Sequence, residues 1–330
     1  MNRVDELLGR HVSLRAMQVL RRLTGPIVVV HLWPFLDDAR HGRIYRDTFT
    51  EPYAAWYPHL PRDLYVALLW VGAAAAIALS AGVLARAASV TAFAVVTYNV
   101  FLSTTHYHHN RAYLVIVLAA LAVTPTSDDG PAWPLWLLRF EAAVVYGASG
   151  VSKLLDADWW GGTVTWDRVV RVEHRLVSDT PLPGWAVDVL TNREVHTVAA
   201  KVIVVTELFL AVGLWFRRTR YAAVWVAVVF HVLIEIAASV QVFSYLAVVA
   251  LLVWAVPSTR DRVVRVDGGG WARVVAALDW LHRFRIERGG RLEVVDRDGR
   301  VVRGRSAGAL VLSRLPVTAW FALPFRATWR

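Results

Sequence analysis

Residues Leu64 to Leu84 read LYVALLWVGAAAAIALSAGVL, without one charged side chain. At about 1.5 Å per residue, a helix of this length crosses a hydrocarbon core of roughly 30 Å. Similar windows recur along the 330-residue chain, in which apolar residues make up 56%. Short basic or tryptophan-rich connectors separate the windows, and they leave too little polar surface to cover them in water. The sequence therefore predicts an all-α, polytopic transmembrane helical bundle.

We expect about eight spans, because a helix satisfies its own backbone hydrogen bonds in lipid. The predicted spans are 16–36, 64–84, 87–103, 111–125, 134–154, 197–216, 220–237 and 240–257. Arginines precede the first span, separate spans two and three as well as six and seven, and follow the last. By the positive-inside rule, these connectors and both termini are cytoplasmic. The outer side then carries the loops 37–63, 104–110 and 155–195.

After Pro257 the composition becomes polar and glycine-containing. Two short alternating segments around Asp298-Gly299 predict a hairpin, and the stretch after Ser306 predicts a helix. We therefore expect a membrane domain at 1–257 and a small α+β cytoplasmic appendage at 258–330.

Composition excludes several classes of function. The chain has no cysteine, so disulfides, thiolate nucleophiles and thiolate metal sites are ruled out. Its formal charge of +10 comes from arginines in the tails and short connectors, not from a folded basic face with interleaved aromatics. The charge therefore predicts orientation in the membrane and no nucleic-acid partner. Sixteen tryptophans, many near window ends, are typical of the headgroup boundary.

The fifth span, with the residues that follow it, reads LLRFEAAVVYGASGVSKLLDADWWGG from Leu137. One stripe of small residues permits close helix approach: Ala143, Gly147 and Gly150. A neighbouring face, at spacings of three, four and seven, carries Tyr146, Ser149 and Lys153. Burial favours the neutral amine, so Lys153 could act as a base. Alternatively, it snorkels to the headgroups and pairs with Asp156 or Asp158.

Other polar residues in or beside the spans are costly in lipid and predict one shared pocket. The segment STTHYHHNRAYL, before the fourth span, carries His106, His108, His109, Asn110 and Arg111. Span six carries Glu207, and span seven carries His231 and Glu235. Clustered histidines also suggest a metal site. Membrane di-iron enzymes use many more histidines in HxxxH and HxxHH boxes, so we expect no metal. A structural hydrogen bond is an alternative role for each histidine.

The run VVYGASGVSKLLDADWWGG, preceded by LLRF, resembles a segment of vitamin K-dependent γ-glutamyl carboxylases and their bacterial HTTM-domain relatives. Supporting stretches are THYHHNRAYL, Glu207 and FHVLIEIAASVQVFSYL, and the resemblance covers about residues 15–257. It implies that Lys153 is the base that deprotonates a vitamin K hydroquinone of the menaquinol type. Oxygen would then add, and the resulting alkoxide would remove a γ-proton from a peptide glutamate before CO2 addition.

The resemblance also implies a functional polar residue before the fourth span, where this chain offers His109, Asn110 and Arg111. We expect His109 and Asn110 to act beside Lys153 in catalysis. The residues expected to bind the quinol, near the outer face of a bacterial plasma membrane, are Tyr146, Glu207, His231, Glu235, Arg111 and His108.

The chain also departs from the carboxylases. Animal carboxylases carry a large luminal domain that recruits propeptide and glutamate substrate, and no such domain follows span eight here. The departure argues against peptide carboxylation, whereas quinol oxygenation needs no peptide partner. The alternative is a non-catalytic lipid- or peptide-binding membrane protein of a peptide maturation or immunity system. A transporter is less favoured, since neither inverted repeats nor paired broken helices are visible.

The tail weakly resembles the end of a DCC-type thioredoxin-like domain, through GRVVRGRSAGALVLSRLPVTAWFALPF. Such domains need a cysteine pair near the start, where this tail has DGGGWARV. We therefore expect a redox-inactive remnant.

Overall fold

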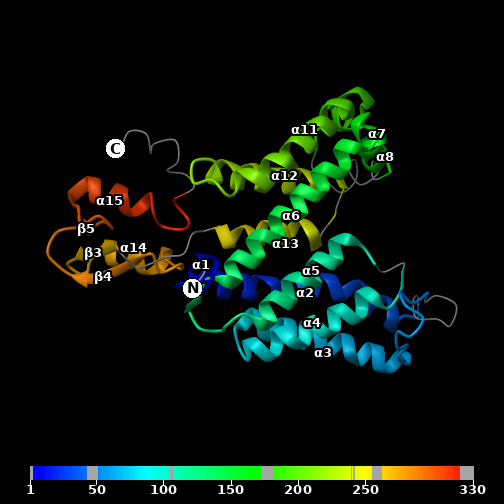
Figure 1. The fold of residues 1–330 in the computed structure, drawn as a ribbon, viewed down its shortest axis with the longest axis horizontal. Helices are drawn as coiled ribbons and strands as arrows, with labels where there is room; N and C mark the ends of the chain where they lie inside the picture. Colours follow the sequence, from blue (N-terminus) through cyan, green and yellow to red (C-terminus); the bar gives the residue numbers. More distant parts are fainter. Residues whose placement is uncertain are drawn as a thin grey trace. The chain divides into compact units, whose positions relative to one another are not determined.

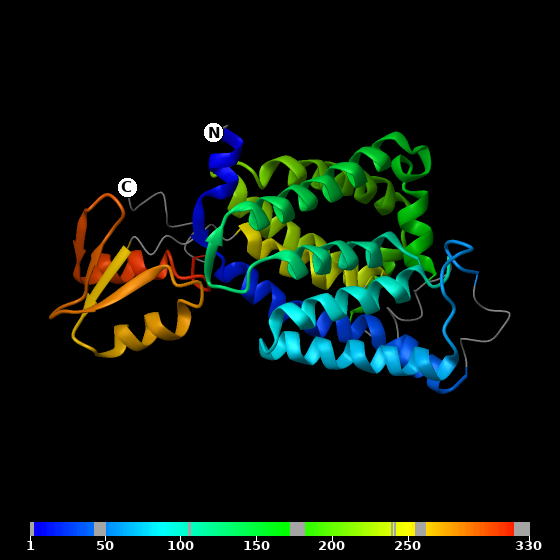
Figure 2. The ribbon, with the colours of Figure 1, turned by 60° about the horizontal axis from the view of Figure 1, so that its bottom comes forward.

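The computed structural model describes residues 3–42, 51–104, 107–171, 182–238, 240, 242–254 and 262–319. The chain forms two compact units, which are coloured along the sequence in Figure 1 and Figure 2. The larger unit comprises Val19–Thr126 and Pro134–Trp254. The smaller unit comprises Met1–Gln18, Ser127–Trp133 and Ala255–Arg330.

A helix lies at the position of every predicted span. These helices are α2 (Arg15–Arg40), α3 (Arg62–Ala81), α4 (Ala85–Phe101), α5 (His109–Val123), α6 (Trp133–Leu155), α11 (Arg193–Gly213), α12 (Arg220–Ala238) and α13 (Val242–Ala250), which the 3-10 helix η1 (Leu251–Trp254) continues. The mostly helical fold is thus confirmed. The largest shifts are in α2, which continues from the predicted residue 36 to Arg40, and in α11, which begins at Arg193 instead of 197.

Three of the described helices are long and apolar enough to cross a membrane, by length and composition alone: α2, α3 and α11. The most apolar of them is α3, with a mean hydropathy of 2.1. Helix α5 has 15 residues, which span only about 22 Å. Helix α6 is longer but carries Arg139, Glu141 and Lys153. The count of eight spans therefore stays a prediction.

The exposed face of α11 is apolar. Its exposed valines are Val198, Val202, Val205 and Val212, with 64%, 58%, 64% and 57% of their surface accessible. Spacings of four, three and seven place all four on one side of the helix. In water, such a stripe would expose a large apolar patch, whereas lipid solvates it without cost. The chain is a membrane protein.

Close packing holds the helices of the larger unit together. Helix α3 packs against α4, α4 against α5, α5 against α13, and α12 against both α11 and α13 (Figure 1). At Gly72 of α3, an added Cβ would lie 2.7 Å from both Leu32 of α2 and Val95 of α4. Only glycine therefore allows these three helices to approach as closely as they do.

The predicted outer loop 155–195 contains short helices in its described part: α7 (Ala157–Trp160), α8 (Thr163–Val170) and α10 (Gly184–Thr191). Asp156 caps α7 by accepting hydrogen bonds from the backbone N–H groups of Asp158 and Trp159, at 2.9 and 3.2 Å. Gly162, with φ of 78°, precedes α8, and a Cβ there would lie 2.6 Å from the backbone of His196. The start of α8 is thus docked on α11.

The smaller unit begins with α1 (Arg3–Gly9) and β1 (His11–Ser13), which pairs antiparallel with β2 (Asp129–Pro131). Its other elements are β3 (Arg262–Val266), α14 (Gly270–Leu278), β4 (Phe284–Arg288), β5 (Glu293–Val295), β6 (Val301–Arg303) and α15 (Gly304–Leu312). The sheet order is β4-β3-β5-β6, with β3 parallel to β4 and the other pairs antiparallel. The hairpin predicted around Asp298-Gly299 is confirmed by the β5–β6 pair. The predicted helix begins at Gly304, slightly before Ser306.

Candidate functional site

Helices α6 and α11 approach each other where the small-residue stripe predicts. At Gly150, an added Cβ would lie 2.9 Å from Leu208 and 3.3 Å from the Cβ of Glu207. At Gly147, one turn earlier, an added Cβ would lie 3.6 Å from Ala211. A larger residue at 150 would separate the two helices, and the side chain of Glu207 would no longer reach the polar face of α6.

The polar face of α6 binds Glu207 through two side chains. The Lys153 amine donates to Glu207 Oε1 at 2.5 Å and to Ser149 Oγ at 2.8 Å, and Ser149 Oγ donates to the same Oε1 at 3.1 Å. The side chain of Lys153 is 16% exposed and that of Glu207 is 6% exposed. The other carboxylate oxygen, Oε2, is buried and has no hydrogen-bond partner among the described residues. The structure thus brings Lys153, Ser149 and Glu207 together.

This pairing identifies the acidic partner of Lys153. The predicted snorkelling interaction with Asp156 or Asp158 is wrong, because Asp156 caps α7 and the amine turns inward to α11. The ring of Trp159 in α7 lies beside the pair, with its centroid 4.7 Å from the Lys153 amine. Arg168 of α8 also lies over this ring, at 5.8 Å. Helix α7 therefore covers the ion pair with an aromatic ring.

A second polar contact lies two turns earlier on α6. Tyr146 Oη lies 2.8 Å from Nε2 of His231 on α12, and both side chains are buried. His231 also packs edge-on against Phe243 of α13, with ring centroids 5.5 Å apart. Its other ring nitrogen, Nδ1, has no partner among the described residues. Tyr146 and Lys153 are seven residues apart on one helix face, so two polar contacts lie along the same side of α6.

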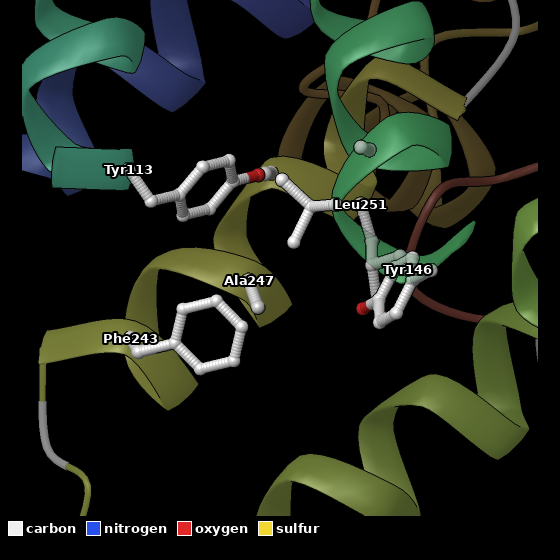
Figure 3. Close-up of a pocket in the computed structure, with 8 residues that line it drawn as sticks. Tyr113, Tyr146, Phe243, Ala247 and Leu251 are labelled. Carbon is white, nitrogen blue, oxygen red and sulfur yellow. The ribbon is translucent and has the colours of Figure 1, made fainter. Parts of the chain in front are cut away.

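A small, narrow cavity of about 10 Å³ lies beside Tyr146. Figure 3 shows the rings of Tyr113, Tyr146 and Phe243 around Ala247 and Leu251. The lining residues come from α5, α6, α13 and η1, and apart from the two tyrosine hydroxyls their side chains are apolar: Tyr113, Ala142, Val145, Tyr146, Phe243, Ala247, Ala250 and Leu251. The lining is apolar and aromatic, and the free space is about that of one water molecule.

None of the described residues before the fourth span has a hydrogen bond or ion pair with Lys153. Asn110 and Arg111 lie in the first turn of α5, and the Arg111 guanidinium stacks over Phe35 of α2 at 4.9 Å. His108 and His109 are exposed. Partial desolvation, together with the nearby Arg111, His109 and Arg168, lowers the pKa of His108. His108 therefore lies near Arg168 of α8, while His106 lies outside the described residues.

Two acidic residues, Glu235 and Glu141, differ from what the sequence predicts. Glu235, predicted to line the pocket, accepts a long hydrogen bond of 3.5 Å from Tyr245 and is not among the pocket-lining residues. Glu141 of α6 was not predicted, although both its carboxylate oxygens are buried and lack hydrogen-bond partners among the described residues. It is the only acidic residue of α6, and that could have singled it out in the sequence. No group of three metal-ligating side chains occurs within the described ranges.

A further buried network, also not predicted, joins the first half of the bundle. Tyr65 Oη of α3 donates to Asn99 Oδ1 of α4 at 2.5 Å, and Asn99 Nδ2 lies 3.3 Å from His31 Nε2 of α2. All three side chains are almost fully buried. Because an unpaired polar group is costly in lipid, this network fixes the register of the three helices.

Comparison with known proteins now gives the family. The family model described as the HTTM domain matches residues 10–258, about three quarters of the chain. The chain belongs to the HTTM-domain family. No curated protein and no solved structure matches it.

The HTTM match contains every residue of the candidate site, from His108 to Glu235, and every pocket-lining residue. The sheet of the C-terminal appendage follows the HTTM match. Membership in the HTTM family confirms the resemblance drawn from the fifth span, while the individual roles of the site residues stay predictions.

Proposed function

We propose that this HTTM-domain chain is a membrane enzyme that oxygenates a vitamin K hydroquinone of the menaquinol type, with Lys153 as the base. The HTTM domain is associated with the vitamin K-dependent carboxylase family. The observation that carries the proposal is the Lys153 amine, held against Glu207 Oε1 among packed helices. The pair combines a potential base with an acceptor for the proton that the base must first lose.

The proton transfer follows from the low dielectric of the site. Two opposite charges are costly to desolvate, and moving one proton from Nζ to Glu207 leaves two neutral groups. The neutral amine can then accept the proton of a phenolic hydroxyl, with Ser149 and Trp159 holding it in place. Glu207, expected from the sequence to line the quinol pocket, thus takes a more direct role as the proton acceptor of Lys153.

The aromatic residues around the small cavity support binding of the quinol ring, which requires the cavity to widen. Tyr113, Tyr146 and Phe243 offer three ring faces to a flat apolar molecule, and the Tyr146–His231 contact offers a polar group that can orient a hydroxyl. The hydroquinone would supply the electrons that reduce O2, giving the quinone epoxide and water. Carboxylation of a glutamate-containing peptide with CO2 remains a further step that we propose only as a secondary activity.

The proposal includes a topology of eight spans in a bacterial plasma membrane, with both termini cytoplasmic and Lys153 near the outer face. Arginines before α2, in the first turn of α4 and in the connector between α11 and α12 support this orientation. The cysteine-free chain allows a direct test with single introduced cysteines. A cysteine at Arg86 should resist an impermeant thiol reagent applied to cells, whereas one at Thr163 should react. The reverse pattern would refute the orientation.

The order of strands and helices in the tail supports its interpretation as a thioredoxin-like remnant. It has a β-α-β unit with parallel strands, followed by an antiparallel hairpin and a helix. With no cysteine in the chain, we propose a redox-inactive appendage.

The alternative, a non-catalytic lipid- or peptide-binding protein, is favoured by one observation. The Lys153 amine already contacts Glu207, Ser149 and Trp159, as expected for a clamp between α6 and α11. Under this alternative, substitution of Lys153 would change stability without any activity being lost.

One assay separates the two functions. Purified protein in detergent, supplied with reduced vitamin K and oxygen, should form the epoxide at a rate above that of heat-treated protein. A parallel reaction with labelled bicarbonate and a glutamate-containing peptide measures carboxylation. Epoxide without labelled peptide would support quinol oxygenation alone. Equal rates in the native and heat-treated samples would favour the non-catalytic alternative.

A further inference from the structure

Three tryptophans surround a buried arginine where α6, η1 and the α11–α12 turn meet. Trp136 stacks on Trp215 with ring centroids 6.0 Å apart, and Trp215 meets Trp254 edge-on at 5.0 Å. The guanidinium of Arg139 lies 5.3 Å from the Trp136 ring and 5.4 Å from the Trp254 ring. Its Nε donates to the carbonyl of Val253 at 2.8 Å. Arg139 is thus fixed between two aromatic faces, with only 5% of its surface exposed.

The neighbouring turn between α11 and α12 adds three more arginines. Arg220 donates from Nε to the Leu214 carbonyl at 3.0 Å and from Nη2 to the Trp215 carbonyl at 3.1 Å, which closes the turn. Its guanidinium lies 5.8 Å from the Trp254 ring. Arg217 and Arg218 lie in the turn itself and are exposed. Four cations therefore belong to one small region of the larger unit.

Within the part of the chain that the structure describes, no ion pair balances this region. The sequence from Leu208 to Ile234 contains no aspartate or glutamate. Among the ion pairs of the described residues, none includes any of the four arginines. The Nη2 atom of Arg139 is buried without a hydrogen-bond partner in the same part of the chain. A buried cation without a counter-ion is costly, because low dielectric extends the range of its charge.

Apolar side chains flank the cations. Phe140 follows Trp136 by one turn of α6 and is 63% exposed, and Phe216 follows Trp215 and is 60% exposed. A ligand suited to this surface has a negative headgroup and apolar chains. Basic pockets between membrane helices bind anionic lipid headgroups on the cytoplasmic side, and interfacial tryptophans mark the same depth.

We propose that this region, defined by Arg139, Arg217, Arg218 and Arg220 with their three tryptophans, binds the phosphate of an anionic phospholipid. Arg217 and Arg218 contact the headgroup, and its charge compensates the buried Arg139. The Trp136–Trp215–Trp254 stack holds Arg139 and the turn in position, while Phe140 and Phe216 lie against the acyl chains. The proposal does not depend on quinol chemistry, because none of these residues belongs to the Lys153 site.

Native mass spectrometry of the full chain in detergent tests the proposal. Phosphatidylglycerol and phosphatidylcholine with identical acyl chains are titrated separately, and inorganic phosphate is added in a third series. We expect phosphatidylglycerol to bind at least about tenfold more tightly than phosphatidylcholine. In the variant Arg217→Gln/Arg218→Gln, the affinity for phosphatidylglycerol should fall about thirtyfold, since each arginine near a headgroup contributes about 1 kcal/mol.

The matched control removes two exposed arginines elsewhere, as Arg10→Gln/Arg86→Gln. If the site is local, the affinity of this control for phosphatidylglycerol should lie within about threefold of that of the original chain. An equal loss in the control, or equal affinity for the two lipids, would overturn the proposal. Displacement of phosphatidylglycerol by inorganic phosphate would show that the region recognises free phosphate instead of a lipid. Unchanged melting temperatures show that each variant is folded.

Discussion

Glu207→Leu is expected to destabilise the folded chain in detergent by about 3–5 kcal/mol, because it leaves the Lys153 amine buried without a counter-ion. The effect should be large since the Lys153 and Glu207 side chains are only 16% and 6% exposed. Ser149 would remain as a hydrogen-bond partner but carries no charge. Reversible unfolding in detergent, followed by circular dichroism, measures the change.

The double variant Lys153→Met/Glu207→Leu should recover most of the lost stability. Two apolar side chains of similar volume remove both desolvation costs, as for other buried ion pairs. The exposed pair Arg171–Asp167, at 2.7 Å, provides the control, and Asp167→Asn should cost at most about 1 kcal/mol. If Glu207→Leu cost no more than this control, the Lys153–Glu207 pair would not be isolated from water as described.

The positions of the helices could be predicted because an apolar segment in lipid has few backbone conformations other than a helix. A charge-free window such as Leu64 to Leu84 must satisfy its backbone internally, and α3 is the result. The observed end of α3 is set locally, where Gly82 adopts φ of 73° and its N–H bonds to the Leu79 carbonyl. Hydropathy does not carry such capping information, so the predicted ends were less accurate than the predicted positions.

The polar face of α6 could be predicted from helical periodicity, but its partner could not. Spacing alone places Tyr146, Ser149 and Lys153 together. Pairing of Lys153 with Glu207 depends on the register between α6 and α11, which the contact at Gly150 fixes. The nearby Asp156 was the obvious candidate in the sequence, yet it caps a short helix instead. The residues next to Lys153 in the sequence therefore indicated the wrong counter-ion for its amine.

The role of the histidine-rich segment was harder to place because it depends on tertiary contacts. His108 lies near Arg168 of α8, and Arg111 stacks on Phe35 of α2. Neither contact follows from sequence spacing, since the segments are distant along the chain. The pocket aromatics Tyr113 and Phe243 lie within stretches that supported the family resemblance, but nothing in the sequence indicated that they face each other.

The central claim is that the Lys153 amine accepts a proton from the quinol, and loss of this amine should have the largest effect on activity. General base catalysis contributes roughly 10² to 10⁴-fold to a rate. Lys153→Ala removes the base while leaving the pocket residues Tyr113, Tyr146 and Phe243 in place. We therefore expect the epoxide-forming rate to fall by about this factor, with little change in the quinol concentration needed for half-maximal rate.

The chain offers an unusually clean control, because Lys201 is its only other lysine. Lys201 is exposed on α11, with its amine 5.6 Å from the Trp160 ring. Lys201→Ala should retain the full rate of epoxide formation. The decisive measurement is the rate of epoxide formation by Lys153→Ala and Lys201→Ala, purified and assayed side by side with the original chain. The account predicts loss only in Lys153→Ala, and undiminished turnover in that variant would contradict it.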